Sequence, residues 1–128
     1  MSHQFPIRVY YEDTDMGGIV YHANYLRYIE RARSAWVRDL GNDQNAMRDG
    51  GLVWVVRRIE AEYLATARFD DDLMVETTVR KITPARLVME QVVRRAETPI
   101  FTAVVTAVCM NAKGQPVRLP AEIRALMR

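Results

Sequence analysis

The spacing of apolar and polar residues changes twice along this chain and divides it into a strand, a helix and further strands. Residues 6–12 alternate and carry β-branched and aromatic side chains, which favours a strand. Between residues 23 and 40 the apolar positions follow a helical period instead. The stripe that they form consists of Tyr25, Tyr28, Ile29, Ala32, Trp36 and Leu40. The pattern predicts an amphipathic helix, with Asn24 as N-cap and Gly41 directly after its end.

After the helix, strand-like runs alternate with short polar turns. Residues 41–51 are rich in Asn, Asp and Gly and predict an irregular connection. The runs that follow cover residues 53–66, 73–83, 86–96 and 100–112, and residues 120–127 predict a last short helix. Residues 101–110 are apolar or Thr throughout, which is typical of a strand covered on both faces. The turns between the strands are too short for parallel crossovers, so neighbouring strands should be antiparallel.

These elements predict an α+β fold in which one long helix lies across a curved antiparallel sheet of five strands. The length of 128 residues, without a linker or an internal repeat, fits one domain spanning residues 1–128. A single helix covers only one face of such a sheet. The uncovered edges and apolar surface therefore favour an oligomer.

The composition of the chain limits the kinds of binding partner that are expected. The 18 basic and 16 acidic residues leave a net charge of +2 and are scattered, so bulk nucleic-acid binding is not expected. A local basic patch for a phosphorylated ligand remains open. No apolar run approaches the ~20 residues of a transmembrane helix, and residues 1–6 do not resemble a signal peptide. The lone Cys109 lies in an apolar run and is expected to be a buried core residue. A cytoplasmic protein is the expectation.

The chemistry-bearing residues gather between Tyr10 and Tyr25. Asp15 follows the first strand and precedes Gly17 and Gly18, which let the backbone turn tightly and approach a ligand. The first N–H groups of the next helix lack helical acceptors and could stabilise a developing oxyanion. A carboxylate close by could attack an acyl carbonyl or activate water. Asp15 could equally be a simple turn former.

Several other kinds of site find less support. Glu12 and Asp13 are weaker candidates, because acids at strand ends are usually solvated. His22 could act through its side chain or only supply a backbone N–H. The two histidines and single cysteine form no cluster with metal-ligand spacing, so no metal site is expected. The sequence also lacks a phosphate loop, a dinucleotide glycine pattern and a Gly-x-Ser-x-Gly elbow.

Two stretches of the chain resemble a known family. The segment RVYYEDTDMGGIVYHANY at residues 8–25 resembles the active-site signature of the 4-hydroxybenzoyl-CoA thioesterase family, most closely its YbgC branch of acyl-CoA thioesterases. The continuation YIERAR at residues 28–33 fits the same branch, as do VVRRI at 55–59, EY at 62–63 and ARFDD at 67–71. The first motif is long and specific, and the resemblance spans most of the chain.

The resemblance implies a hotdog fold, in which a sheet wraps one long helix, assembled as homodimers and often homotetramers. It places the catalytic aspartate at Asp15 and the oxyanion amide at His22, whose side chain is expected to assist. The active site would lie at a dimer interface. The residues expected to shape the thioester pocket are Gly18, Val20, Tyr21 and Tyr25. Arginines and Lys81 at strand ends could receive the phosphates of CoA, and no cofactor or metal is needed.

The sequence departs from the YbgC branch at one position, and it leaves two other functions open. Many members of the branch carry an acid where this chain has Ala35, which predicts a changed interface or acyl pocket. The main alternative to hydrolysis is a non-catalytic module that binds acyl-CoA or acyl carrier protein. A hotdog dehydratase or hydratase is a third reading, but the motifs of those enzymes differ from residues 15–22.

Overall fold

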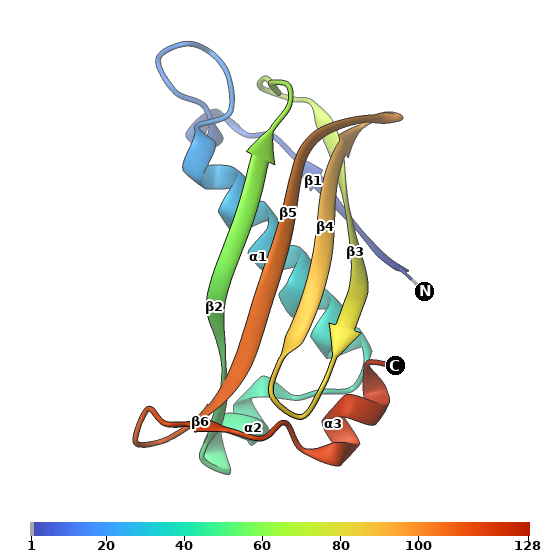
Figure 1. Cartoon of the computed structure of the whole chain (residues 1–128). Helices are drawn as coiled ribbons and strands as arrows, with labels where there is room; N and C mark the ends of the chain where they lie inside the picture. Colours follow the sequence, from blue (N-terminus) through green and yellow to red (C-terminus); the bar gives the residue numbers. More distant parts are fainter. Residues whose placement is uncertain (1) are drawn as a thin grey trace.

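A computed structural model describes residues 2–128 and shows one antiparallel sheet wrapped around one long helix (Figure 1). The sheet contains β1 (Ser2–Arg8), β2 (Leu52–Tyr63), β3 (Asp72–Ile82), β4 (Leu87–Arg95), β5 (Thr98–Asn111) and β6 (Pro116–Val117). The first five strands lie in the order β1-β3-β4-β5-β2, and β6 pairs with β5. The predicted hotdog fold is confirmed, although the sheet has six strands and the prediction has five.

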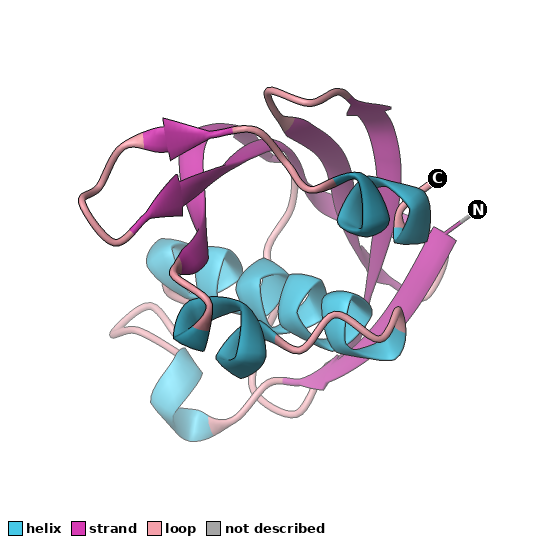
Figure 2. Cartoon of the chain, turned by 90° about the horizontal axis from the view of Figure 1, so that it is seen from below, coloured by secondary structure: helices cyan, strands magenta, loops and turns pink. Residues whose placement is uncertain are grey.

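The long helix α1 (His22–Asp39) buries its apolar stripe against the concave face of the sheet, as Figure 2 shows from below. Tyr28, Ile29 and Ala32 are fully buried in the core. From the sheet, alternate residues such as Val75, Met89, Val93 and Val105 meet them from the other side. Gly41 follows the helix with φ +89°, a conformation that glycine adopts without strain, which confirms its predicted place.

The structure corrects three local predictions. The predicted strand at residues 6–12 ends at Arg8, where its pairing with β3 also ends at Asp72, and Tyr11–Asp13 forms a 3-10 turn, η1. Asn24 is not the N-cap, because Tyr21 occupies that position and Asn24 lies inside the first turn. The predicted irregular connection contains α2 (Gln44–Asp49), whose first N–H groups are capped by the Asp43 carboxylate.

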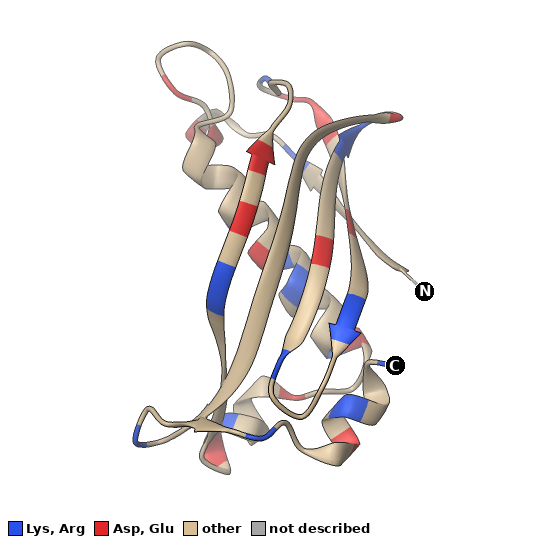
Figure 3. Ribbon diagram, viewed as in Figure 1, with Lys and Arg blue, Asp and Glu red and all other residues tan. Residues whose placement is uncertain are grey.

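The remaining elements follow the prediction closely, with one difference at β5. Helix α3 (Ala121–Leu126) forms where a last short helix is expected. In β5 the inward residues Phe101, Ala103 and Val105 are buried, whereas Thr102 and Val104 on the convex face are only half-buried. The convex face is therefore uncovered in the single chain. Basic and acidic residues are interspersed over the ribbon (Figure 3).

Candidate active site

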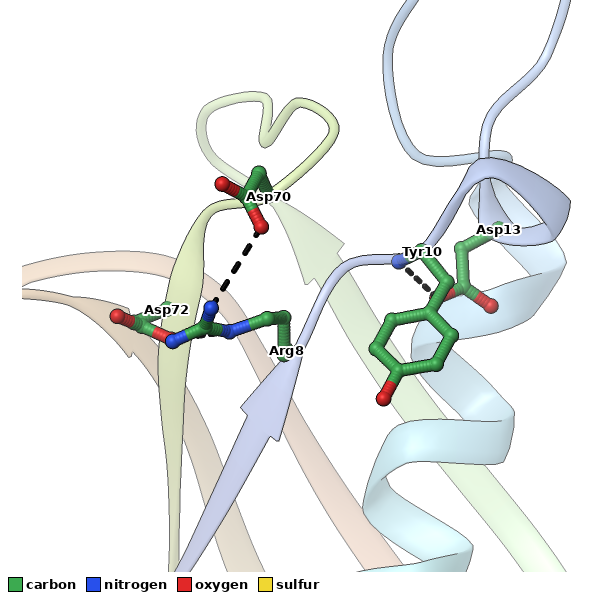
Figure 4. Close-up of polar contacts among 5 residues, drawn as sticks. All are labelled: Arg8, Tyr10, Asp13, Asp70 and Asp72. Carbon is green, nitrogen blue, oxygen red and sulfur yellow. Dashed lines mark hydrogen bonds and ion pairs between the residues drawn. The ribbon is translucent and has the colours of Figure 1, made fainter.

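Asp13 joins the two ends of the loop that carries Asp15. The Asp13 carbonyl oxygen accepts the Tyr21 N–H at 2.9 Å and the Asn24 side-chain amide at 2.8 Å. Its carboxylate accepts the Tyr10 N–H at 2.8 Å (Figure 4). Asp13 is only 9% exposed, so the expectation that it is solvated is wrong. Asp13 instead ties the end of η1 to the start of α1.

Ion pairs support the backbone just before this loop. At the end of β1, the Arg8 guanidinium lies 2.8 Å from the Asp72 carboxylate and 3.6 Å from that of Asp70 (Figure 4). In addition, the Val9 N–H donates to the Asp71 carbonyl and the Asp70 N–H donates to the Val9 carbonyl. The segment that enters the loop is therefore fastened to the turn that precedes β3.

Between its closed ends, the loop makes a tight turn. Thr14 and Val20 form an antiparallel bridge, and the Asp15 N–H donates to the Ile19 carbonyl at 2.9 Å. The Gly18 N–H donates to the Asp15 carbonyl at 3.0 Å. Gly18 has φ +79°, which a residue with a side chain adopts only with strain. The glycine predicted to permit a sharp turn therefore does so.

The Asp15 carboxylate is exposed and partly oriented. Its Oδ1 atom accepts the Gly17 N–H at 2.8 Å. Within residues 2–128 no other hydrogen bond or ion pair to this carboxylate is formed, so Oδ2 is free to approach a ligand. The local bond is the one expected of a turn-forming aspartate. The turn role and a chemical role are compatible, because they use different oxygens.

The helix α1 begins at His22 without a side-chain cap. In the described part of the chain the His22 N–H donates to no acceptor, as expected for a first helical residue. The imidazole is exposed beside the Tyr21 ring, with centroids 4.5 Å apart. No hydrogen bond among residues 2–128 joins the His22 and Asp15 side chains. The loop therefore carries a free carboxylate oxygen and leads directly to a free amide.

The four predicted pocket residues lie in two environments. Gly18 and Tyr21 are exposed beside the loop. Val20 and Tyr25 are 4% and 2% exposed. Val20 donates its N–H to the Ala67 carbonyl at 2.8 Å, and Tyr25 stacks on Phe101 with ring centroids 5.1 Å apart. Burial raises the pKa of the Tyr25 hydroxyl. In the single chain, Val20 and Tyr25 support the loop and helix from the core.

Tyr63 contacts the site, although no sequence motif predicts this role. Its hydroxyl donates to the His22 carbonyl at 2.9 Å, and its ring packs edge-on against Tyr25 and Phe101. Tyr63 lies at the end of β2, an edge strand of the sheet. The EY pair at residues 62–63 is the available signal, but nothing local in it points to His22.

The inner face of β2 is open. Val56, Ile59 and Tyr63 pair with Ala107, Val105 and Phe101, whose side chains point into the core. They nevertheless remain 41%, 38% and 49% exposed, because α1 crosses the sheet diagonally toward β3 and β1 (Figure 1). The open inner face of β2, defined by these three residues, therefore adjoins the start of α1.

Two further findings bear on the kind of site. Within residues 2–128, no three His, Cys, Asp or Glu side chains come together in a group that could hold a metal ion. No helix in the same range is long and apolar enough to cross a membrane.

Comparisons with known proteins agree with this geometry. The family model of the thioesterase-like superfamily matches residues 9–127. The acyl-CoA thioesterase YbgC of Haemophilus influenzae is 42% identical over 123 residues, covering 94% of this chain and 90% of that protein. The acyl-CoA thioester hydrolase YbgC of an Escherichia coli O6:H1 strain is 40% identical over 124 residues, covering 95% and 92%.

Solved structures share the fold. A probable thioesterase from Bartonella henselae superposes with a TM-score of 0.90 at 38% identity, covering 94% of this chain and all of that one. A 4-hydroxybenzoyl CoA thioesterase mutant, solved in complex with 4-hydroxybenzoyl CoA, has a TM-score of 0.92 at 22% identity and covers 99% of each chain. At that identity, the second likeness concerns the fold alone.

The hotdog sheet, the closed loop and the match over residues 9–127 define the class: the chain belongs to the thioesterase-like superfamily. Within this superfamily it is a homologue of the YbgC thioesterases. The family resemblance and the thioester hydrolase class predicted from sequence are thereby confirmed.

Proposed function

We propose that this protein hydrolyses acyl-CoA thioesters to the free acid and CoA, using the Asp15 carboxylate and the backbone amide of His22. The observation that carries the proposal is the closed loop, which carries a free carboxylate oxygen on the exposed Asp15 and leads to a helix-start N–H, that of the exposed His22, without a partner among residues 2–128. The thioester carbonyl oxygen would accept the His22 N–H. Similarity to proteins named acyl-CoA thioesterases supports the substrate class.

The His22 amide stabilises charge that develops during the reaction. As a nucleophile adds to the thioester carbonyl, negative charge grows on the oxygen, and a preoriented N–H at the positive end of a helix dipole favours that state. Tyr63 fixes the neighbouring peptide through the His22 carbonyl. A donor that is already oriented requires little reorganisation in the transition state.

Asp15 can act by two routes. As a nucleophile, its oxygen bonds to the carbonyl carbon, the C–S bond breaks, and CoA leaves as a thiolate that takes up a proton. Water then hydrolyses the mixed anhydride. As a general base, Asp15 takes a proton from water, whose oxygen attacks the carbonyl carbon directly. The C–S bond then breaks, and the CoA thiolate leaves and takes up the proton from Asp15. Rapid acid quenching and mass spectrometry distinguish the routes, because only the first adds an acyl group to the peptide that contains Asp15.

The decisive experiment compares wild type with Asp15→Asn on a panel of acyl-CoAs and on acyl carrier protein charged with the same acyl groups. Release of free thiol should fall by about a thousandfold or more, since removing a group that acts in covalent or acid–base chemistry has effects of about that size. Asp49→Asn is the matched control, because Asp49 is an exposed acid at the end of α2.

Three outcomes would contradict the proposal or part of it. Equal hydrolysis by folded Asp15→Asn and wild type would refute the role of Asp15. Tight acyl-CoA binding by wild type without turnover would favour the non-catalytic module. Hydration of a 2-enoyl-CoA in place of hydrolysis would favour the dehydratase class.

We also propose that the site is completed in a homodimer through the free edge of β2. This strand pairs only with β5 within residues 2–128, and its opposite edge is unpaired. The open inner face of β2 lies beside that edge and beside the start of α1. A second copy added at this edge would cover apolar surface and enclose the substrate region.

The cytoplasmic location expected from the sequence also stays a prediction.

A further inference from the structure

Arg33 is a half-buried cation on α1 that the proposed chemistry does not use. One guanidinium nitrogen, Nη1, donates to the Gln91 side-chain oxygen at 3.0 Å. Burial lowers the pKa of the Arg33 guanidinium, whereas the charge of Glu30 raises it. Gln91 comes from the neighbouring strand β4, so the contact joins the helix to the sheet. Arg33 is therefore held in place by a partner that carries no charge.

Gln91 is fixed in one orientation. It is fully buried, and its side-chain nitrogen donates to the Ile29 carbonyl at 3.0 Å and to the Thr77 hydroxyl oxygen at 2.9 Å. Turning the amide over would place its oxygen against the Ile29 carbonyl, which cannot donate, and a second donor against Arg33. The Gln91 oxygen must therefore face the guanidinium, which positions Arg33 before any ligand arrives.

No carboxylate among residues 2–128 forms an ion pair with Arg33. Glu30, whose charge raises the pKa of the Arg33 guanidinium, is exposed and accepts a hydrogen bond from the Ser34 hydroxyl at 3.0 Å. Water screens an exposed charge far more than a half-buried one. A half-buried guanidinium without a counter-ion has donors available for an oxygen ligand, and pairing it would offset the free-energy cost of its burial.

Arg33 lines a cavity of about 170 Å³ between α1 and the sheet. Besides Arg33 and Ser34, the walls include Val37, Val56, Leu87 and Met89. Glu30 and Gln44 add polar atoms at the same cavity. A cavity with aliphatic walls and a few polar side chains, of which Arg33 is the one cation, fits an apolar chain that ends in an oxygen.

The cavity lies on the same side of α1 as the start of the proposed site. His22, Leu26 and Arg33 recur at a spacing that places them on one line along a helix. At a rise of about 1.5 Å per residue, Arg33 is about 16 Å from His22 along the axis. Across from this line, the open inner face of β2 runs from Tyr63, bonded to His22, to Val56, which lines the cavity.

We propose that this cavity receives the far end of the acyl group and that Arg33 donates hydrogen bonds to an oxygen carried there. The preferred substrates would then be acyl-CoAs whose distal carbon bears a carboxylate or a hydroxyl. The inference rests on the proposed thioesterase function, because it assigns the far end of the substrate whose thioester lies at His22. The carboxylate and the hydroxyl both place an oxygen acceptor at the end of an apolar chain. The kinetic test distinguishes these two kinds of substrate.

The kinetic test compares acyl-CoAs of equal length with and without a terminal oxygen. Octanoyl-, 8-hydroxyoctanoyl- and suberoyl-CoA form one set, and decanoyl-, 10-hydroxydecanoyl- and sebacoyl-CoA form another. Wild type should favour at least one oxygenated member of a set by about tenfold in kcat/KM, equivalent to one good hydrogen bond to a charged group. Arg33→Met should abolish this ratio, and Arg33→Lys should retain part of it.

Arg31→Met is the matched control, because Arg31 is an exposed arginine on the same helix. It should keep the wild-type ratio. Val56→Trp is a second variant that leaves the Arg33–Gln91 contact untouched and fills the cavity from β2. It should reduce kcat/KM for the longer set more than for the shorter set. Wild-type ratios near one, or ratios that Arg33→Met leaves unchanged, would overturn the inference.

A binding measurement separates failure of this inference from failure of the proposed function. Calorimetric titration with suberate and with octanoate requires no turnover, and suberate should bind wild type more tightly than octanoate. Arg33→Met should remove that difference. Such binding in a protein that hydrolyses no acyl-CoA would refute the thioesterase proposal and keep the Arg33 site. Hydrolysis without any difference between suberate and octanoate would refute the Arg33 site alone.

Discussion

At the scale of single residues, Gly17 controls where the Asp15 carboxylate lies. Its N–H donates to Asp15 Oδ1, and a Cβ built on Gly17 would lie 3.2 Å from that same oxygen. That separation is tighter than an ordinary van der Waals contact. A Cβ at position 17 would therefore displace the neighbouring carboxylate by a few tenths of an ångström, whereas the positive φ of Gly18 is required by the turn itself.

Gly17→Ala should displace the Asp15 carboxylate and lower kcat/KM for acyl-CoA by about tenfold, or about 1.4 kcal/mol of transition-state stabilisation. The fold should persist, because the loop is exposed. Free-thiol release and thermal unfolding measure the two effects. Gly50→Ala is the control, since its Cβ would meet its neighbours at an ordinary 3.5 Å. A Gly17→Ala enzyme as active as Gly50→Ala would contradict this role.

His22 allows its side chain and its backbone to be tested separately. His22→Ala removes the imidazole but keeps the N–H at the start of α1, so the oxyanion donor survives. We expect the activity of His22→Ala to exceed that of Asp15→Asn by about tenfold or more, because the imidazole only assists. Steady-state kinetics of both variants on one acyl-CoA check this. Equal losses would show that the imidazole is as necessary as the carboxylate.

At the scale of elements, Glu76 joins three strands at the β1 edge of the sheet. Its carboxylate on β3 accepts hydrogen bonds from Arg94 on β4 at 2.7 Å and from Gln4 on β1 at 3.0 Å. The hydrogen bond from Arg94, followed by the attraction of that charge, lowers the pKa of the Glu76 carboxyl below its ordinary value. Protonation of Glu76 would therefore loosen this corner of the sheet.

The pH dependence of stability follows from that lowered pKa. Because the carboxyl is more acidic when folded, its contribution is present above the unfolded pKa of about 4.3 and is lost as the pH falls through the folded value. Glu76→Gln should show a smaller loss of unfolding free energy between about pH 5 and about pH 3 than wild type. Urea unfolding measures it. Glu97→Gln, in an exposed turn, should behave like wild type.

Local pattern predicts the helix and most strands because each has a strong period of its own. The helix predicted at residues 23–40 forms at His22–Asp39, since the apolar stripe and Gly41 define both ends. The end of β1 is not predicted, because η1 depends on the bond between the Asp13 carboxylate and the Tyr10 N–H. The β-rich composition of residues 6–12 carries no sign of that turn.

The residues of the site also divide into those that the sequence indicates and those that depend on the three-dimensional fold. Asp15, Gly18 and His22 lie in one short segment, so the sequence alone indicates them. Tyr63 reaches His22 across 41 residues, and Gln91 reaches Arg33 across 58. Such contacts depend on which strands become neighbours in the sheet and on where α1 crosses it. No spacing within a single motif indicates them.

At the scale of the whole molecule, the proposed dimer makes stability depend on concentration. If β2 pairs with β2 of a second copy, light scattering should give a mass of two or four times 14.8 kDa, and the thermal midpoint should rise with protein concentration. Ile59→Lys should weaken the assembly. Met74→Lys is the control, because Met74 is equally exposed, at 38%, on β3 away from β2. A monomer at every concentration would contradict the pairing.

Because Asp13 holds together the two ends of the loop at residues 14–20, the exposed part of this loop can be replaced by another sequence. Its two ends are joined to each other by the Asp13 carbonyl, and Val20 is the loop residue that is buried in the core, so the core beneath does not depend on the exposed residues 15–18. Lengthening a loop whose ends are already held together costs little free energy, because closure entropy grows only slowly with length. One scaffold can therefore accept new reaction loops, and so diversify its chemistry, without rebuilding its helix or its sheet.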